Sequence, residues 1–161
     1  MQRPLPALRR AIERAAPAPV RFVVITASPA IEANRDAGWG RAGATVIAEE
    51  HAAARMASGL RPGENSDAAT PSLGFSEVQQ IHVTDEDVHV VRQKPGNTNA
   101  DVSAHFETAG VVFLGNAYIA DGYPTVDEAH GGTFDGLVET AAGDALVTAC
   151  VHSLAAPSAA K

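Results

Sequence analysis

Two side chains that can exchange a proton lie close together in the second half of the chain. Asp127 and His130 are three residues apart in a long segment, 115–132, that is expected to be a loop. A carboxylate beside an imidazole can act as an acid–base unit. The same pair could instead cap the loop before the helix expected from Phe134. The sequence leaves both interpretations open.

Glu32 is a second candidate acid or base, and Tyr123 is a third. Glu32 follows an apolar run that predicts a buried strand, and α/β proteins usually place their chemistry in the loop after a strand's carboxyl end. A carboxyl group in an apolar pocket is a useful acid or base near neutral pH. His130 or Tyr123 would complement Glu32 from the opposite wall. Glu32 could also start a helical turn that faces solvent.

Charge and composition limit the partners of this chain of 161 residues, which has a formal net charge of -7. Nucleic-acid binding needs a basic patch, so we expect none, and the same charge disfavours an anionic membrane surface. No apolar run approaches the ~20 residues of a membrane span. Charges interrupt the first residues, so we expect no secretory signal. The lone Cys150 excludes an internal disulfide and a multi-cysteine zinc site, and it fits the cytoplasmic location that we expect.

The elements that position these side chains can be predicted from the spacing of apolar residues. We expect helices over 5–16, 49–58 and 134–142, and strands over 20–26, 44–48, 78–83, 88–91, 102–106, 111–114 and 145–151. Residues 60–74 are rich in Pro, Gly, Asn and Ser, which predicts an exposed loop. Residues 155–161 are expected to be a frayed tail. The order predicts a single α/β (α+β layered) domain over 1–161.

Several other residues have simpler expected roles. Glu49 and Glu50 are expected to be a solvated helix start, and 85–87 (Asp-Glu-Asp) a solvated turn. His89 and His105 lie on predicted strands and could face one another across a sheet, or they could be ordinary surface or half-buried histidines.

The frame around these candidates resembles the metallo-β-lactamase superfamily. PVRFVVIT and GRAGATVIAEEHAAAR resemble the strand that precedes the superfamily's metal motif and the Gly-Ala-Thr strand that follows it. KPGNTNADVSAHFETAGVVFLGN resembles its Gly-His-Thr-x-Gly-Asp segment and next strand, and GYPTVDEAHGGTFDGLVET resembles the loop and helix of a hydrolase subgroup. The resemblance covers residues 5–142. It implies that Trp39 packs in the core, because the matching position of the superfamily is usually aromatic. It implies a partial αββα sandwich from which the amino-terminal strands are missing.

The positions that the resemblance gives to zinc ligands carry other side chains. The four ligands of the first motif fall on Ala27, Pro29, Ile31 and Glu32, the histidine of the second segment falls on Asn97, and the bridging aspartate on Asn116. Asp101, a structural aspartate in the superfamily, is retained. Ala, Pro and Ile offer no side-chain ligand and Asn is a weak neutral donor, so we expect no metal and no cofactor. Without zinc, no bound water is acidified for hydrolysis.

Three functions are consistent with these residues, and we rank them. The first is a metal-free cleft for a small organic molecule, with a cyclase- or lyase-type acid–base step of a biosynthetic kind. Its catalytic residues would be Glu32, His130 and Tyr123, and its binding residues Ser28, Asp36, Asn97, Asp101, Asn116 and Asp127. The second is a non-catalytic partner or structural subunit, most simply a homodimer, because missing strands leave apolar sheet surface for another chain to cover. The third is a zinc-dependent hydrolase.

Overall fold

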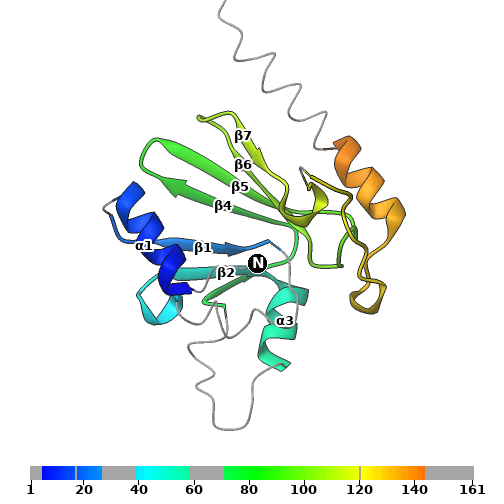
Figure 1. Ribbon diagram of the computed structural model, residues 1–161, viewed down its shortest axis with the longest axis horizontal. Coiled ribbons are helices and arrows are strands. Elements are labelled where there is room, and N and C mark those ends of the chain that lie inside the picture. Colours follow the sequence, from blue (N-terminus) through cyan, green and yellow to red (C-terminus); the bar gives the residue numbers. More distant parts are fainter. Residues whose placement is uncertain (1–4, 17, 27–38, 59–70, 120, 144–161) are drawn as a thin grey trace, which may run out of the picture.

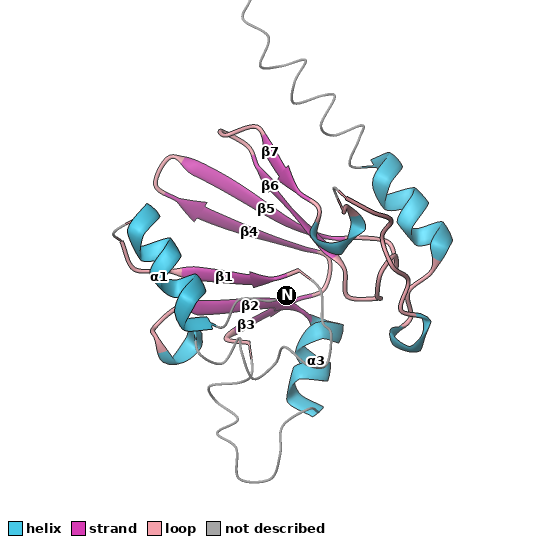
Figure 2. Ribbon diagram, in the orientation of Figure 1, coloured by secondary structure: helices cyan, strands magenta, loops and turns pink. Residues whose placement is uncertain are grey.

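The computed structural model describes residues 5–16, 18–26, 39–58, 71–119 and 121–143. In this part of the chain, two β-sheets pack face to face, and the helices α1 (Leu5–Ala15) and α3 (Glu50–Ser58) lie beside the first sheet (Figure 1). Figure 2 shows the strands as two layers, with a further helix over 134–143 at one end of the second layer. The layered α/β class is therefore confirmed.

The first sheet is parallel and has the order β1 (Phe22–Ile25), β2 (Thr45–Glu49), β3 (Leu73–Phe75). The first two strands and both flanking helices were predicted from their apolar spacing. The prediction of a loop through residue 74 is wrong at its end, because Leu73 and Gly74 pair with Ile47 and Ala48 of β2. β3 is too short for its apolar residues to show the alternation of a strand, and its backbone hydrogen bonds to β2 define it. Residues 59–70 lie outside the described part of the chain.

The second sheet is antiparallel and has the order β4 (Val78–Val83), β5 (Glu86–Arg92), β6 (Val102–Phe106), β7 (Val111–Phe113). His89 pairs with His105 across β5 and β6, the arrangement that the sequence left open. The predicted turn at 85–87 is wrong, because Glu86 and Asp87 already pair with β4. The turn is shorter and includes Thr84, whose positive φ of 54° allows a tight hairpin.

The core has two parts, one on each face of the first sheet. Val23 and Ile25 of β1 point to the helices, where Trp39 is 7% exposed as expected, and Phe22 and Val24 point to the second sheet. This alternation is the period of two that a strand imposes on its side chains. The buried residues between the two sheets are Ile47, Phe75, Ile81, Val88, Val90, Val102 and Ala104.

The helix over 134–143 packs closely on the chain that follows β5. A Cβ atom added to Gly136 would lie 1.8 Å from the carbonyl oxygen of Pro95, so only glycine fits this contact. The helix was predicted, whereas the predicted strand over 145–151, which includes Cys150, and the tail over 155–161 lie outside the described residues. None of the helices that the structure describes is long and apolar enough to cross a bilayer.

Candidate functional site

Three segments meet where β1 ends. The carbonyl oxygen of Thr26 accepts a hydrogen bond from the Val102 backbone at 3.2 Å. Gly115 has a φ of +56°, and an added Cβ would lie 3.2 Å from the Val102 carbonyl oxygen and 3.3 Å from Thr26 Cβ. The end of β1, the start of β6 and the 3₁₀ helix η1 (Gly115–Ala117) therefore form one edge of the sandwich.

Asn97 and Asn116 meet at this edge. The Asn116 Nδ2 donates to Asn97 Oδ1 at 3.1 Å, and Asn97 Nδ2 donates to the carbonyl oxygen of Thr125 at 2.8 Å. Asn97 is 7% exposed. Two of the six positions that the resemblance gives to zinc ligands are thus joined to each other as a neutral amide pair.

Asp101 holds the loop that carries Asn97. It is 4% exposed, and its carboxyl group accepts hydrogen bonds from the Asn97 backbone at 2.6 Å, the Thr98 backbone at 3.0 Å and the Thr98 hydroxyl at 2.8 Å. Burial raises the pKa of Asp101, and the hydrogen bonds from Thr98 and Asn97 oppose that rise. The side chain closes the turn and fixes the amide pair.

Asp127 and His130 lie next to the same loop. His130 Nδ1 lies 2.6 Å from Asp127 Oδ2, and this hydrogen bond lowers the pKa of Asp127. The Asp127 backbone donates to the Asn97 carbonyl oxygen at 2.8 Å, and the Asn99 backbone donates to the His130 carbonyl oxygen at 3.1 Å. Both side chains are partly exposed, at 39% and 35%. The pair leaves His130 Nε2 as the ring nitrogen that can exchange a proton with a ligand.

Asp127 also has the capping role that the sequence left open. It is the N-cap of the 3₁₀ helix η2 (Glu128–His130), and its side chain accepts a hydrogen bond from the His130 backbone at 3.2 Å. Capping and acid–base chemistry are compatible, because each uses a different oxygen of the carboxylate.

The remaining predicted site residues are not brought to this cluster by the described structure. Tyr123 is 93% exposed, so its ring forms no wall opposite the amide pair. Ser28, Glu32 and Asp36 lie outside the described residues.

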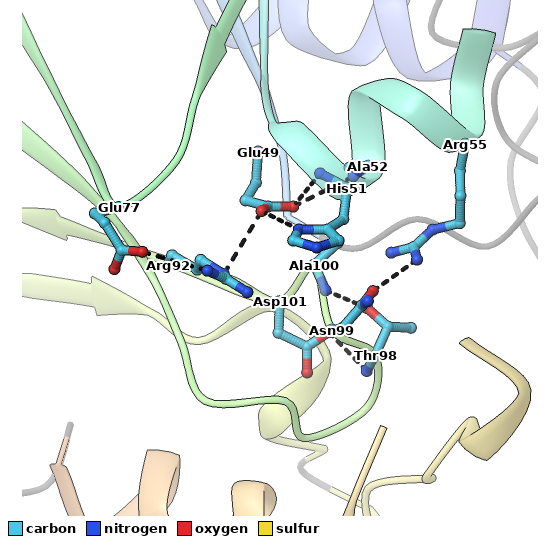
Figure 3. A network of polar contacts seen from close by, with 10 residues as sticks. All are labelled: Glu49, His51, Ala52, Arg55, Glu77, Arg92, Thr98, Asn99, Ala100 and Asp101. Carbon is cyan, nitrogen blue, oxygen red and sulfur yellow. Dashed lines mark hydrogen bonds and ion pairs between the residues drawn. The ribbon is translucent and has the colours of Figure 1, made fainter. Parts of the chain in front are cut away.

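A buried acidic side chain lies near this edge, at the start of α3 (Figure 3). Glu49 is 0% exposed, and its Oε2 accepts hydrogen bonds from the His51 and Ala52 backbones at 2.7 and 3.3 Å. Its Oε1 lies 2.6 Å from His51 Nδ1 and 3.5 Å from Arg92 Nε. The prediction that Glu49 is solvated is therefore wrong. Its pairing with Arg92 of β5 has no local sequence signal, whereas Glu50 is exposed as expected.

Arg55 is the second cation in Figure 3, and sequence reasoning did not single it out. Its Nη1 donates to Asn99 Oδ1 at 2.7 Å. Its Nε and Nη2 atoms are closed off from solvent and have no hydrogen-bond partner. In the part of the chain that the structure describes, no carboxylate pairs with it. Its contact with the 97–101 loop, far away in the sequence, is what connects it to the site.

Zinc does not fit the side chains described at this edge. Among the described residues, no three His, Cys, Asp or Glu side chains lie close enough together to hold a metal ion. Asn97 and Asn116 hydrogen bond to each other, and neutral amides are weak zinc ligands in any case. We therefore derive no zinc-dependent step from them.

Comparisons with known proteins place the fold. No protein-family model matches the chain, and no curated protein matches it in sequence. Among solved structures, a metallo-β-lactamase from Pontibacter korlensis matches 89% of this chain and 64% of its own, with 15% identity and a TM-score of 0.71. The metallo-β-lactamase IND-7 matches 89% of this chain and 62% of its own, with 15% identity and a TM-score of 0.68.

A third match, the B3 metallo-β-lactamase BLEG-1, covers 89% of this chain and 71% of its own, with 15% identity and a TM-score of 0.67. The chain thus spans less than two thirds of the length of the first two proteins. Identities this low show the fold alone. Over most of its length, this chain has part of the metallo-β-lactamase fold.

Proposed function

We propose that this chain binds a small organic molecule at the edge where Asn97 and Asn116 meet, and that it does so without a metal. Asparagine amides offer neutral donors and acceptors, which orient a polar ligand without a charge of their own. In this proposal Asp127 and His130 form the acid–base pair that acts on the bound molecule.

The observation that carries the proposal is the Asn116 Nδ2 to Asn97 Oδ1 hydrogen bond of 3.1 Å. It joins two positions that the resemblance gives to zinc ligands. The Asp127–His130 pair is tied to the same loop by backbone hydrogen bonds to Asn97 and Asn99. A carboxylate–imidazole pair beside an amide pair suits proton transfer to or from a positioned molecule.

The proposed chemistry needs only side chains of this chain. The Asp127 carboxylate accepts the Nδ1–H of His130, which fixes the ring orientation and its tautomer. Nε2 then removes a proton from the ligand and returns it later in the reaction. Such a cycle supports an elimination or a cyclisation, the lyase or cyclase classes expected from the sequence.

The test is a ligand screen followed by NMR on protein with isotope-labelled histidines. Binders are expected to shift the ring signals of His130 and to lose about tenfold or more in affinity in His130→Gln. His82→Gln is the matched control, because His82 forms a similar pair with Asp87 at 2.7 Å on the β4–β5 hairpin. Binders that leave the His130 signals unmoved and keep their affinity in His130→Gln would contradict the proposal.

A second candidate function is that of a non-catalytic partner or structural subunit, and an apolar opening favours it. A cavity of about 530 Å³ opens between the sheets, and its lining includes Phe22, Val24, Ile81, Val83, Val88 and Phe106. Within the described residues, β1 pairs on one side only. An unpaired apolar edge beside an apolar opening is suited to a second chain, most simply another copy. Light scattering that finds only monomer at micromolar concentration would remove the homodimer.

A further inference from the structure

We propose that Arg55 binds a carboxylate group of the ligand, so that the proposed binding site is specific for small carboxylic acids. This inference rests on the function proposed above, because it names the class of molecule that the same site accepts.

The geometry of the guanidinium group supports this assignment. Arg55 extends from α3 toward Asn99 (Figure 3), and its Nη1 donates to Asn99 Oδ1 at 2.7 Å. The opposite edge of the group, formed by Nε and Nη2, is closed off from solvent and donates to no acceptor. These two nitrogens present parallel N–H groups, the fork that binds both oxygens of a carboxylate.

The unpaired edge is also unfavourable in the free protein. A buried donor without an acceptor, on a charged group, loses its hydration and gains nothing in return. An incoming carboxylate supplies both the acceptors and the opposite charge. Arg55 keeps this positive charge without a carboxylate partner among the described residues, although the chain has a net charge of -7.

Asn99 connects Arg55 to the proposed acid–base pair. The Asn99 side chain accepts from Arg55, and its backbone donates to the His130 carbonyl oxygen at 3.1 Å. Gly131 lies against the same side chain, since an added Cβ would be 3.2 Å from Asn99 Cβ. A carboxylate held by Arg55 would therefore lie beside the loop that carries Asn97, one member of the amide pair.

The experiment titrates the protein with benzoate and succinate and, as neutral controls, with benzamide and succinamide. NMR of the arginine Nε–H signals and of the histidine rings reports the two ends of the site separately. We expect both carboxylates to shift the Arg55 signal and both amides to bind about tenfold more weakly or worse. Carboxylates and amides that bind alike would overturn the inference, as would no Arg55 response to either carboxylate at millimolar concentration.

Variants separate binding from a merely structural role. Arg55→Met should reduce carboxylate affinity by about tenfold or more, and Arg55→Lys should reduce it less, because it keeps the charge without the fork. Arg10→Met, at an exposed arginine of α1, is the control and should leave affinity unchanged. Undiminished carboxylate binding in a folded Arg55→Met would overturn the inference.

The histidine signals distinguish this inference from the function on which it rests. If benzoate shifts the Arg55 signal but no binder shifts His130, the carboxylate site stands and the proposed acid–base function fails. If amides and carboxylates shift His130 equally and Arg55→Met changes nothing, the proposed function stands and the carboxylate inference fails.

Discussion

The two partly buried arginines of Figure 3 differ in their partners. Arg92 Nη1 lies 3.3 Å from Glu77, and Arg92 Nε lies 3.5 Å from Glu49 without forming a hydrogen bond. Two carboxylates therefore balance the charge of Arg92. Among the described residues, Arg55 has no carboxylate partner, and its hydrogen bond goes to the neutral Asn99, at 2.7 Å. Both side chains have a buried donor without a hydrogen bond, so the carboxylate partners are what distinguish them. A cation paired with carboxylates belongs to the network that holds the fold, whereas a partly buried cation without a carboxylate is a candidate binding position. Their different partners make Arg92 part of a structural network and leave Arg55, in the same small region, as a candidate binding residue.

The largest expected effect is at the balanced network. Glu49→Gln should lower the free energy of unfolding by about 3 kcal/mol, because it leaves Arg92 without its buried partner and weakens the cap of α3. Urea denaturation measures this loss. Arg92→Met and the double variant complete a cycle, in which we expect a coupling of about 1 kcal/mol or more. Strictly additive losses would show that Glu49 and Arg92 do not interact.

The expected effect of Arg55→Met on stability is much smaller, within about 1 kcal/mol of the original protein. The variant loses the hydrogen bond to Asn99 but also removes two buried donors that have no acceptor, and these contributions oppose each other. The same urea experiment provides the comparison with Glu49→Gln. A loss as large as that of Glu49→Gln would make Arg55 a structural residue and remove the contrast between the two arginines.

The smallest expected effect concerns pH. The lowered pKa of Asp127 means that its carboxylate stabilises the fold above its ordinary pKa of about 4 and loses this contribution as the pH falls through the lowered value. The stability difference between the original protein and Asp127→Asn should therefore shrink below about pH 4. Urea midpoints at several pH values measure it, and a difference that stays constant down to pH ~3 would contradict this assignment.

Asp87 provides a matched control for that experiment. Its pKa is also lowered, first by its hydrogen bond to His82, and this pair lies on the β4–β5 hairpin. Asp87→Asn should show the same direction of pH dependence in stability. Only Asp127→Asn should weaken ligand binding, so equal losses of binding in the two variants would detach Asp127 from the site.

Sequence patterns predicted the features that depend on near neighbours. The apolar runs of β1 and β2 define strands because their side chains alternate between two buried faces, and the three-residue spacing of Asp127 and His130 is short enough for the contact that the structure has. β3 was missed because Leu73–Phe75 is too short for a period, and it forms through its pairing with β2.

The missed polar residues depend on contacts between distant parts of the chain. The Glu49-Glu50 pair is locally a good helix start. Burial of Glu49 is made tolerable by its hydrogen bonds with His51 and Ala52 and by the approach of Arg92 on β5, which the local sequence does not signal. In the sequence, Arg55 looks like an ordinary basic residue near the end of a helix. Its importance follows from where the 97–101 loop places Asn99, which Asp101 controls through its hydrogen bonds.

The central claim is that the proposed binding site works without a metal, and the metal content of the protein tests it most directly. Protein purified without a chelator, analysed by elemental mass spectrometry and titrated with zinc by calorimetry, should contain far less than stoichiometric zinc and bind none tightly. The Asn97–Asn116 amide pair is the physical reason for this expectation. One zinc ion per chain, lost in His130→Gln and retained in the His82→Gln control, would contradict the account.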